Sequence, residues 1–186
     1  MKQLLIILLA TWTCIAYGQD KGDYVQYNKV TEVTGTPYVI ASVERLGKVF
    51  ETKEKYLLFI NTKTTQTKRV DFLHDAYIQR IEQFRADSLG INKIIVSGQT
   101  LDTDGKDGID YWKDPQQVIV LSADGQEKVQ LTDSSFFVQN WSVNKQTGTI
   151  VITGHYDTNK NKKYDKTDKN EIVIYDLKTL KLIGKI

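Results

Sequence analysis

The feature of this sequence that most constrains its fold is a threefold internal repeat. Each copy has an opening phrase, a turn that carries glycine, an apolar run, a variable polar loop, a second apolar run and a short closing piece. A recurring succession of this kind indicates several copies of one supersecondary unit. The opening phrases are Tyr24-Val25-Gln26, Tyr77-Ile78-Gln79 and Phe137-Val138-Gln139. They predict repeats of about 24–72, 77–131 and 137–186.

The apolar runs have the composition of β-strands. They are short, rich in β-branched and aromatic residues, and bounded by Gly, Asp, Asn and Thr. The segment 123–126, which contains Asp124-Gly125, favours a tight hairpin, because Asp-Gly tolerates the positive φ angles of a primed turn. We expect four antiparallel strands in each repeat and an all-β chain. The predicted inner strands include 38–41, 56–60, 94–97, 118–121, 149–152 and 172–175.

Residues 75–90 fit two structures. Tyr77, Ile81 and Phe84 recur at helical spacing and predict an amphipathic helix. The repeat, however, aligns this segment with 137–141, where apolar and polar residues alternate as in a strand. We favour the strand and keep the helix as the alternative.

The second and third repeats resemble blades of bacterial periplasmic β-propellers related to WD repeats. The resemblance rests on a strand that ends in small residues, an Asp/Asn-rich loop, the run 172–179 and a closing strand. It covers 94–131 and 149–186 well and 38–70 weakly, and it implies an architecture but no activity. Closed propellers have at least about four blades, so three repeats require a partner chain or an open stack. The alternative is a β-trefoil, which also has three repeats of four strands.

The N-terminus predicts a signal peptide at 1–18. Lys2 supplies a positive charge, 4–10 is apolar, and 16–18 (Ala-Tyr-Gly) is a small-x-small cleavage site. The apolar run is shorter than the about 20 residues needed to span a bilayer. Cys14 lies in a poor lipoprotein context, so we do not expect anchoring through it. Localisation should be periplasmic or secreted, with no transmembrane helix in the mature chain.

Length and charge set the remaining bounds. The chain has 186 residues, which suits a single β-repeat domain over 19–186 with a core of ordinary size. The formal net charge is only +2, and no long basic block is present. We therefore expect no nucleic-acid partner.

Two acidic loops join the first apolar run to the second in the last two repeats. They span 98–114 and 154–168, and oxygen-bearing side chains recur in them at alternating positions. Such spacing suits a hard cation such as calcium, the one cofactor that we expect. The candidate ligands in the first loop are Asp102, Asp104, Asp107, Asp110 and Asp114, and those in the second are Asp157, Asn159, Asn161, Asp165 and Asp168.

The second loop follows the spacing of an EF-hand more closely than the first. It departs from that pattern at position six, where Lys162 replaces glycine, and at position twelve, where Asp168 replaces glutamate. The first loop has fewer lysines and two glycines, so its charge favours a cation more. Any calcium affinity should be weak, with Kd on the order of 10⁻⁴ to 10⁻³ M. The alternative is that both are ordinary turns, since Asp, Asn and Gly favour turns.

No catalytic motif accompanies these loops. The sequence has no Gly-x-Ser-x-Gly elbow and no phosphate-binding glycine loop, and its histidines number only 2. The pattern favours an exported, non-catalytic module that binds an unidentified protein or glycan and weakly binds calcium, and that can form a homo-oligomer. One alternative is a secreted hydrolase or hydrolase subunit with a site near Glu44, Asp71 or His155. Another is a calcium-free structural repeat that assembles into a ring.

Overall fold

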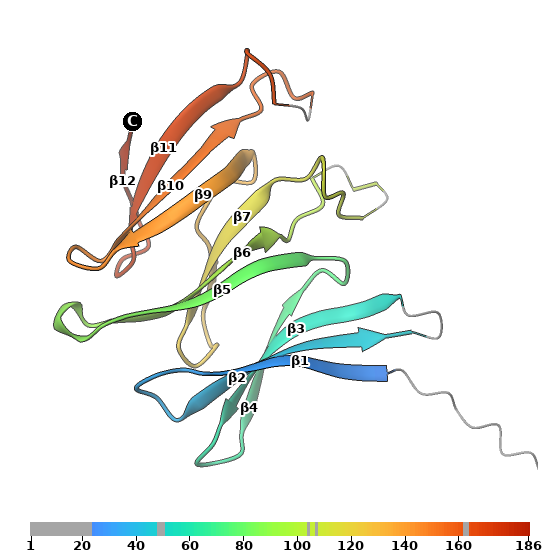
Figure 1. Ribbon diagram of the computed structural model, residues 1–186, viewed down its shortest axis with the longest axis vertical. Helices are drawn as coiled ribbons and strands as arrows, with labels where there is room; N and C mark the ends of the chain where they lie inside the picture. Colours follow the sequence, from blue (N-terminus) through green and yellow to red (C-terminus); the bar gives the residue numbers. More distant parts are fainter. Residues whose placement is uncertain (1–23, 48–50, 104, 107, 162–163) are drawn as a thin grey trace, which may run out of the picture.

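The computed structural model describes residues 24–47, 51–103, 105–106, 108–161 and 164–186. The strands in these ranges form three four-stranded antiparallel sheets (Figure 1). The predicted signal peptide and Cys14 lie outside the described residues. No helix in the described part is long and apolar enough to cross a membrane. The all-β, propeller-like class predicted from the repeat is confirmed.

Each sheet is one repeat, and its strands are hydrogen-bonded in chain order. Because no strand pairing in the described ranges joins two repeats, the β-trefoil alternative, which needs a shared barrel, is wrong. Sheet 1 contains β1 (Tyr24–Glu32), β2 (Tyr38–Leu46), β3 (Thr52–Asn61) and β4 (Thr67–Phe72). Sheet 2 contains β5 (Tyr77–Ala86), β6 (Ile91–Gln99), β7 (Gln116–Ser122) and β8 (Lys128–Gln130). Sheet 3 contains β9 (Phe136–Asn144), β10 (Thr149–Tyr156), β11 (Lys169–Asp176) and β12 (Leu182–Lys185).

The ambiguous segment 75–90 is a strand followed by one 3₁₀ turn, η1 (Asp87–Leu89). The helix alternative is wrong because Ile81 and Phe84 bury on opposite faces of sheet 2. A helix would place these two residues on one face. Gly90 ends the turn with φ 64, a left-handed conformation that glycine adopts without strain.

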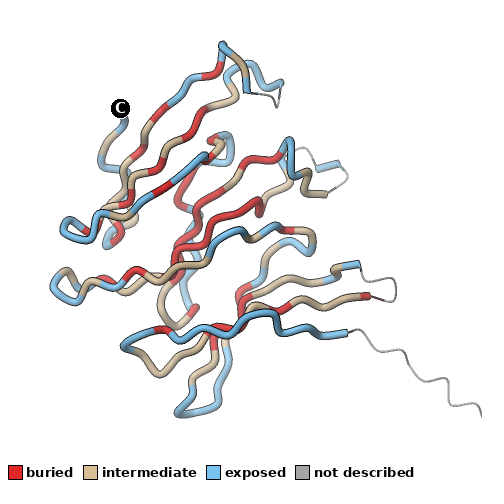
Figure 2. Tube along the Cα trace, in the orientation of Figure 1, coloured by how far each residue is buried: buried red, intermediate tan, exposed pale blue. Residues whose placement is uncertain are grey.

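Two hydrophobic clusters hold the stack together, one on each face of sheet 2. Ile94 and Val96 pack against sheet 1, whereas Ile95 between them packs against sheet 3. Strands buried on both faces read as continuous apolar runs, which is the pattern that β6 and β7 show. Figure 2 shows buried residues along these central strands. The continuous apolar composition of β6 and β7 therefore reflects the position of sheet 2 between the other two sheets.

The first strand of each sheet carries a β-bulge at the same place. The register shifts beside Asn28 in β1, Gln79 in β5 and Gln139 in β9. The bulges align Gln26-Tyr27-Asn28 with the opening phrases of the other two repeats. Our alignment of the first repeat on Tyr24-Val25-Gln26 is therefore wrong by two residues, because a sequence phrase does not mark where the pairing register slips.

Candidate functional site

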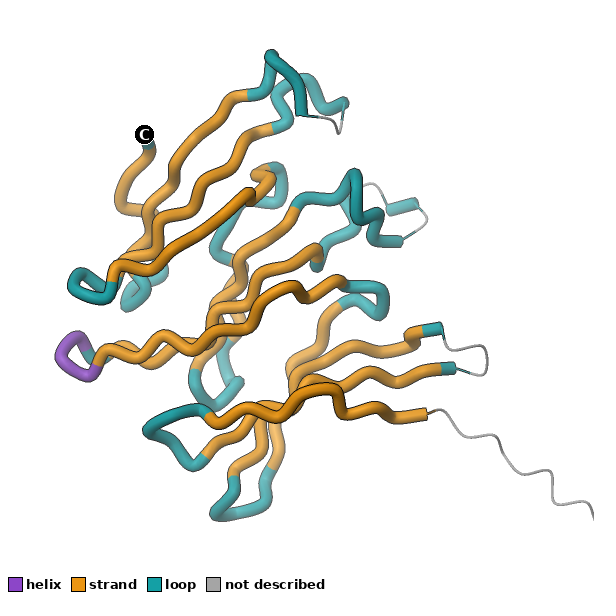
Figure 3. The backbone as a smooth tube through the Cα atoms, viewed as in Figure 1, coloured by secondary structure: helices purple, strands orange, loops and turns teal. Residues whose placement is uncertain are grey.

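Both acidic loops lie at the same end of the strands, where β6 leads to β7 and β10 leads to β11 (Figure 3). In the first loop, Asp114 is buried and its carboxylate accepts three hydrogen bonds. Its donors are the backbone N–H of Thr103 at 2.9 Å, the Thr103 hydroxyl at 2.6 Å and the backbone N–H of Asp110 at 2.8 Å. Asp114 thus fastens both arms of the loop to the start of β7.

The other described carboxylates of this loop also accept bonds from within it. Asp110 accepts from Lys113 Nζ at 2.7 Å and from the backbone N–H of Trp112 at 2.8 Å. The bond from Lys113 is the main cause that lowers the pKa of Asp110. Asp102 accepts from the backbone N–H of Gly105 at 2.7 Å. The remaining candidate ligands, Asp104 and Asp107, lie outside the described residues.

The second loop repeats this construction. Asp168 is buried and accepts the backbone N–H of Thr158 at 3.1 Å and that of Asp165 at 2.8 Å. Asp168 and Asp114 therefore fill the same role, each one or two residues before the next strand. The sequence spacing predicts both residues as calcium ligands, and in the structure each carboxylate accepts N–H groups from both arms of its loop.

Four candidate ligands of the second loop gather near one another. The side-chain amides of Asn159 and Asn161 donate to Asp165 at 3.0 and 2.8 Å, and Asp157 accepts the backbone N–H of Asn161 at 3.0 Å. Hydrogen bonds from Thr167, followed by those from the two asparagines, hold the pKa of Asp165 well below its usual range. Across the described residues, no three His, Cys, Asp or Glu side chains form a group able to hold a metal.

A cavity of about 560 Å³ lies between the two loops. Asp102 and Thr103 line it from the first loop, and Asp157 and Lys160 line it from the second. Ser134 and Ser135, in the segment between sheets 2 and 3, also line it, as does Phe137 in β9. The fold thus brings together two carboxylates that the sequence separates by a whole repeat.

His155 lies beside this cavity and is buried. Its ring stacks on Phe137, with 5.0 Å between ring centroids, and also contacts Tyr164 at 4.7 Å. Its Nδ1 has no hydrogen-bond partner within the described ranges. Burial lowers the pKa of His155, and the nearby carboxylates of Asp168 and Asp157 oppose this shift only in part. Sequence reasoning did not find this packing, because a histidine at a strand end carries no signal of what covers it.

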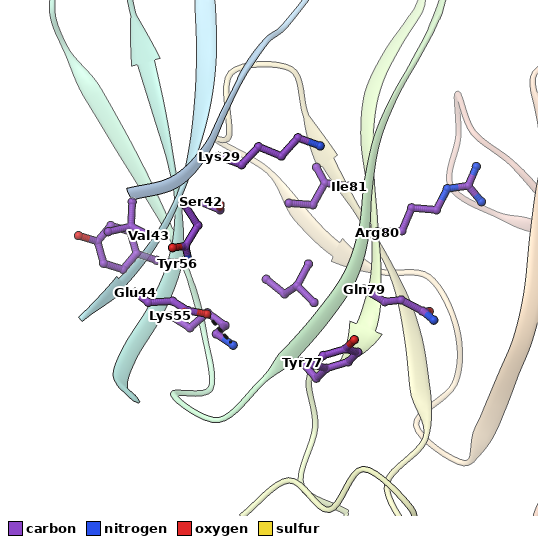
Figure 4. A pocket seen from close by; sticks show the side chains of 12 residues that line it. Lys29, Ser42, Val43, Glu44, Lys55, Tyr56, Tyr77, Gln79, Arg80 and Ile81 are labelled. Carbon is purple, nitrogen blue, oxygen red and sulfur yellow. Dashed lines mark ion pairs between the residues drawn. The ribbon is translucent and has the colours of Figure 1, made fainter. Parts of the chain in front are cut away.

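A second cavity, of about 310 Å³, opens between sheets 1 and 2 (Figure 4). Lys29 and the ion pair between Glu44 and Lys55, at 3.0 Å, lie on the sheet 1 side. Asp71, in β4, is paired with Arg69 at 2.5 Å. Glu44 and Asp71, the carboxylates predicted for a hydrolase site, therefore belong to sheet 1, whereas His155 belongs to sheet 3.

The sequence matches no protein-family model and no curated protein. Among solved structures, the acylaminoacyl peptidase of Pyrococcus horikoshii is 9% identical, with a TM-score of 0.47 over 88% of this chain and 25% of its own. The β-propeller domain of the Trilobed protease from Pyrococcus furiosus is 9% identical, with a TM-score of 0.47 over 88% and 44%. A mutant apocarotenoid oxygenase of Synechocystis is 14% identical, with a TM-score of 0.36 over 80% and 35%. The chain spans less than half of each protein.

Proposed function

We propose that this chain is an exported binding module that takes a glycan in the cavity between its two acidic loops and binds calcium weakly in the second loop. The observation that carries the proposal is that Asp102 and Asp157 line one cavity of about 560 Å³. Each is the first carboxylate of its loop, so the repeat places them at matching positions on neighbouring sheets.

The lining has the chemistry that a sugar ring needs. Sugar hydroxyls donate to carboxylates and exchange hydrogen bonds with hydroxyl side chains, here those of Thr103, Ser134 and Ser135. The apolar face of a sugar packs on an aromatic ring, and Phe137 supplies such a ring in this cavity. His155 stacks on Phe137 and so fixes the orientation of its ring.

Calcium has its best support in the second loop. Asp157, Asn159, Asn161 and Asp165 occupy positions one, three, five and nine of an EF-hand spacing, and hydrogen bonds join them into one group. Rotation of each asparagine amide by half a turn presents oxygen instead of nitrogen to a cation. The lysines of this loop oppose divalent binding, which fits a weak, extracellular type of affinity.

The glycan proposal is tested by affinity electrophoresis against soluble polysaccharides such as xylan, dextran and β-glucan. We expect retardation in at least one of them and a loss of affinity of about tenfold or more in Phe137→Ala and in Asp102→Asn, which corresponds to about 1.4 kcal/mol. Tyr24→Ala, an exposed aromatic residue on β1, is the matched control and should bind like the parent. No retardation, or equal retardation in all variants, contradicts the proposal.

The calcium proposal is tested by thermal melts in calcium and in chelator. At a calcium concentration of about 100 times Kd, the ion should add about 2.7 kcal/mol to the free energy of unfolding. Asp157→Ala/Asp165→Ala should abolish this shift, whereas Asp102→Ala/Asp104→Ala should keep it. If the parent protein melts at the same temperature in calcium and in chelator, the calcium proposal is wrong and both loops are ordinary turns.

A further inference from the structure

The stack of sheets ends in two open faces. Among the described residues, neither hydrophobic cluster covers the outer face of sheet 1 or the outer face of sheet 3, and Figure 1 shows these sheets at opposite ends of the stack. Both faces carry apolar side chains that remain partly exposed. We call the first the leading face, and it includes Val30, Val39, Leu58 and Ile60. We call the second the trailing face, and it includes Val151, Thr153, Ile172 and Ile174.

The trailing face repeats a surface that is buried twice within the chain. Sheet 1 covers sheet 2 with a four-residue block, and sheet 2 covers sheet 3 with the matching block at the same register. In β2 and β3 the block is Ile40, Ser42, Leu57 and Phe59. In β6 and β7 it is Ile95, Ser97, Val118 and Val120. In β10 and β11, on the trailing face, it is Val151, Thr153, Ile172 and Ile174.

The leading face repeats the opposite surface of the same junctions. The block that receives the preceding sheet is Ile94, Val96, Ile119 and Leu121 in sheet 2. It is Ile150, Ile152, Val173 and Tyr175 in sheet 3. At the same register in sheet 1, the leading face has Val39, Ala41, Leu58 and Ile60, of which Ala41 is buried and the other three are partly exposed. The two open faces are therefore the two halves of a junction that the chain already forms twice.

The bulged strands extend this match to the polar rim of each junction. The bulge places Gln79 and Arg80 on the side of β5 that points away from sheet 1 (Figure 4). Arg80 lies over the ring of Trp141 in the next sheet, 3.9 Å from its centroid. Val30 occupies the register position of Trp141 on the leading face, yet it is 65% exposed. Val30 is thus a junction residue without its neighbouring sheet.

We propose that two copies of this chain join head to tail, with the trailing face of each packed on the leading face of the other. Within the chain, a block like that of the trailing face always packs on a block like that of the leading face. A second copy of the chain therefore supplies the matching surface for both open faces. The two junctions generate a closed ring of six sheets, within the range of about four to eight blades seen in propellers. The ring uses the sheet faces and not the loop cavity, so it stands apart from the proposed glycan and calcium sites.

The test is a light-scattering mass of the full chain, measured in chelator without glycan. We expect twice the 21.3 kDa of the chain. Leu58→Glu and Ile174→Glu should each give monomers, because either change buries an unpaired carboxylate in both junctions. Thr64→Glu, in the turn after β3, adds the same charge away from both faces and should remain a dimer. Circular dichroism of every variant separates lost assembly from lost folding.

Mixing the two monomeric variants tests the head-to-tail arrangement. Leu58→Glu retains a native trailing face and Ile174→Glu retains a native leading face, so a one-to-one mixture should form a dimer through one intact junction. A monomeric parent overturns the proposal. So does a dimer that only one of the two variants dissociates, because that result indicates a face packed on its own copy. Masses that grow with concentration overturn the closed ring.

Discussion

Asp114 and Asp168 show how single residues organise the two acidic loops. Each is a buried carboxylate that receives backbone N–H groups from both arms of its loop. The N–H groups at a loop neck need acceptors when they are withdrawn from water. One charged side chain with two oxygens supplies them, and this explains why both loops end on an aspartate one or two residues before a strand.

Asp114→Asn should lower the free energy of unfolding by about 1 to 3 kcal/mol, because an amide replaces an acceptor oxygen with a donor that faces N–H groups. Urea denaturation in chelator measures this loss without any contribution from calcium. Asp87→Asn is the matched control, since Asp87 is 74% exposed and pairs only with Arg85 among the described residues. A loss of equal size in both variants would show that Asp114 does not fasten the loop.

His155 makes stability depend on pH. Burial lowers its pKa in the folded state, whereas an unfolded histidine titrates near about 6.5. Between these two pKa values the unfolded chain binds a proton that the folded chain does not, so the free energy of unfolding falls as pH drops below about 6.5. Urea midpoints measured at several pH values between about 7.5 and about 5.5 should show this slope. His155→Gln should flatten the slope and His74→Gln should retain it.

At the scale of elements, the β-bulges of β5 and β9 are matched by glycines on the neighbouring strands. Gly98 pairs with Ile78, and Gly154 pairs with Val138, each next to the bulged residue. A Cβ at Gly98 would meet the carbonyl oxygen of Tyr77, and one at Gly154 would meet that of Phe137. At these two bulges the backbone approaches too closely for a Cβ, so glycine occupies both positions.

Gly98→Ala should destabilise the protein by about 1 to 3 kcal/mol, because the added methyl group has to displace backbone and not a flexible side chain. Gly184→Ala is the control, since a Cβ there would make its nearest contact at 3.8 Å, with Ile174. Thermal melts of the two variants measure the difference. Equal melting temperatures would mean that the bulge relaxes to accept a side chain.

At the scale of the whole molecule, burial increases toward the middle of the stack. Leu57 and Leu58 are successive residues of β3, and they point to opposite sides of sheet 1. Leu57 is 0% exposed because sheet 2 covers it, whereas Leu58 lies on the leading face and is partly exposed. The contribution of each leucine to stability therefore depends on what neighbours its sheet.

Leu57→Ala should cost about 2 to 5 kcal/mol, the usual loss for a buried leucine. Leu58→Ala should cost clearly less in dilute protein, and its cost should rise with protein concentration as copies associate. Chemical denaturation at two protein concentrations measures both effects. A concentration-independent cost for Leu58→Ala would argue against a partner on the leading face.

The sequence alone determined the strands, the number of sheets and the antiparallel class, because alternation, turn residues and the repeat are local properties. It also located both acidic loops. Tertiary structure decided that β5 is not a helix, that Asp114 and Asp168 act as fasteners, and that Asp102 and Asp157 share a cavity. These features depend on the packing of one sheet on the next. That packing brings distant residues together and withdraws their polar groups from water, so it depends on side chains from different repeats and not on the pattern within one repeat.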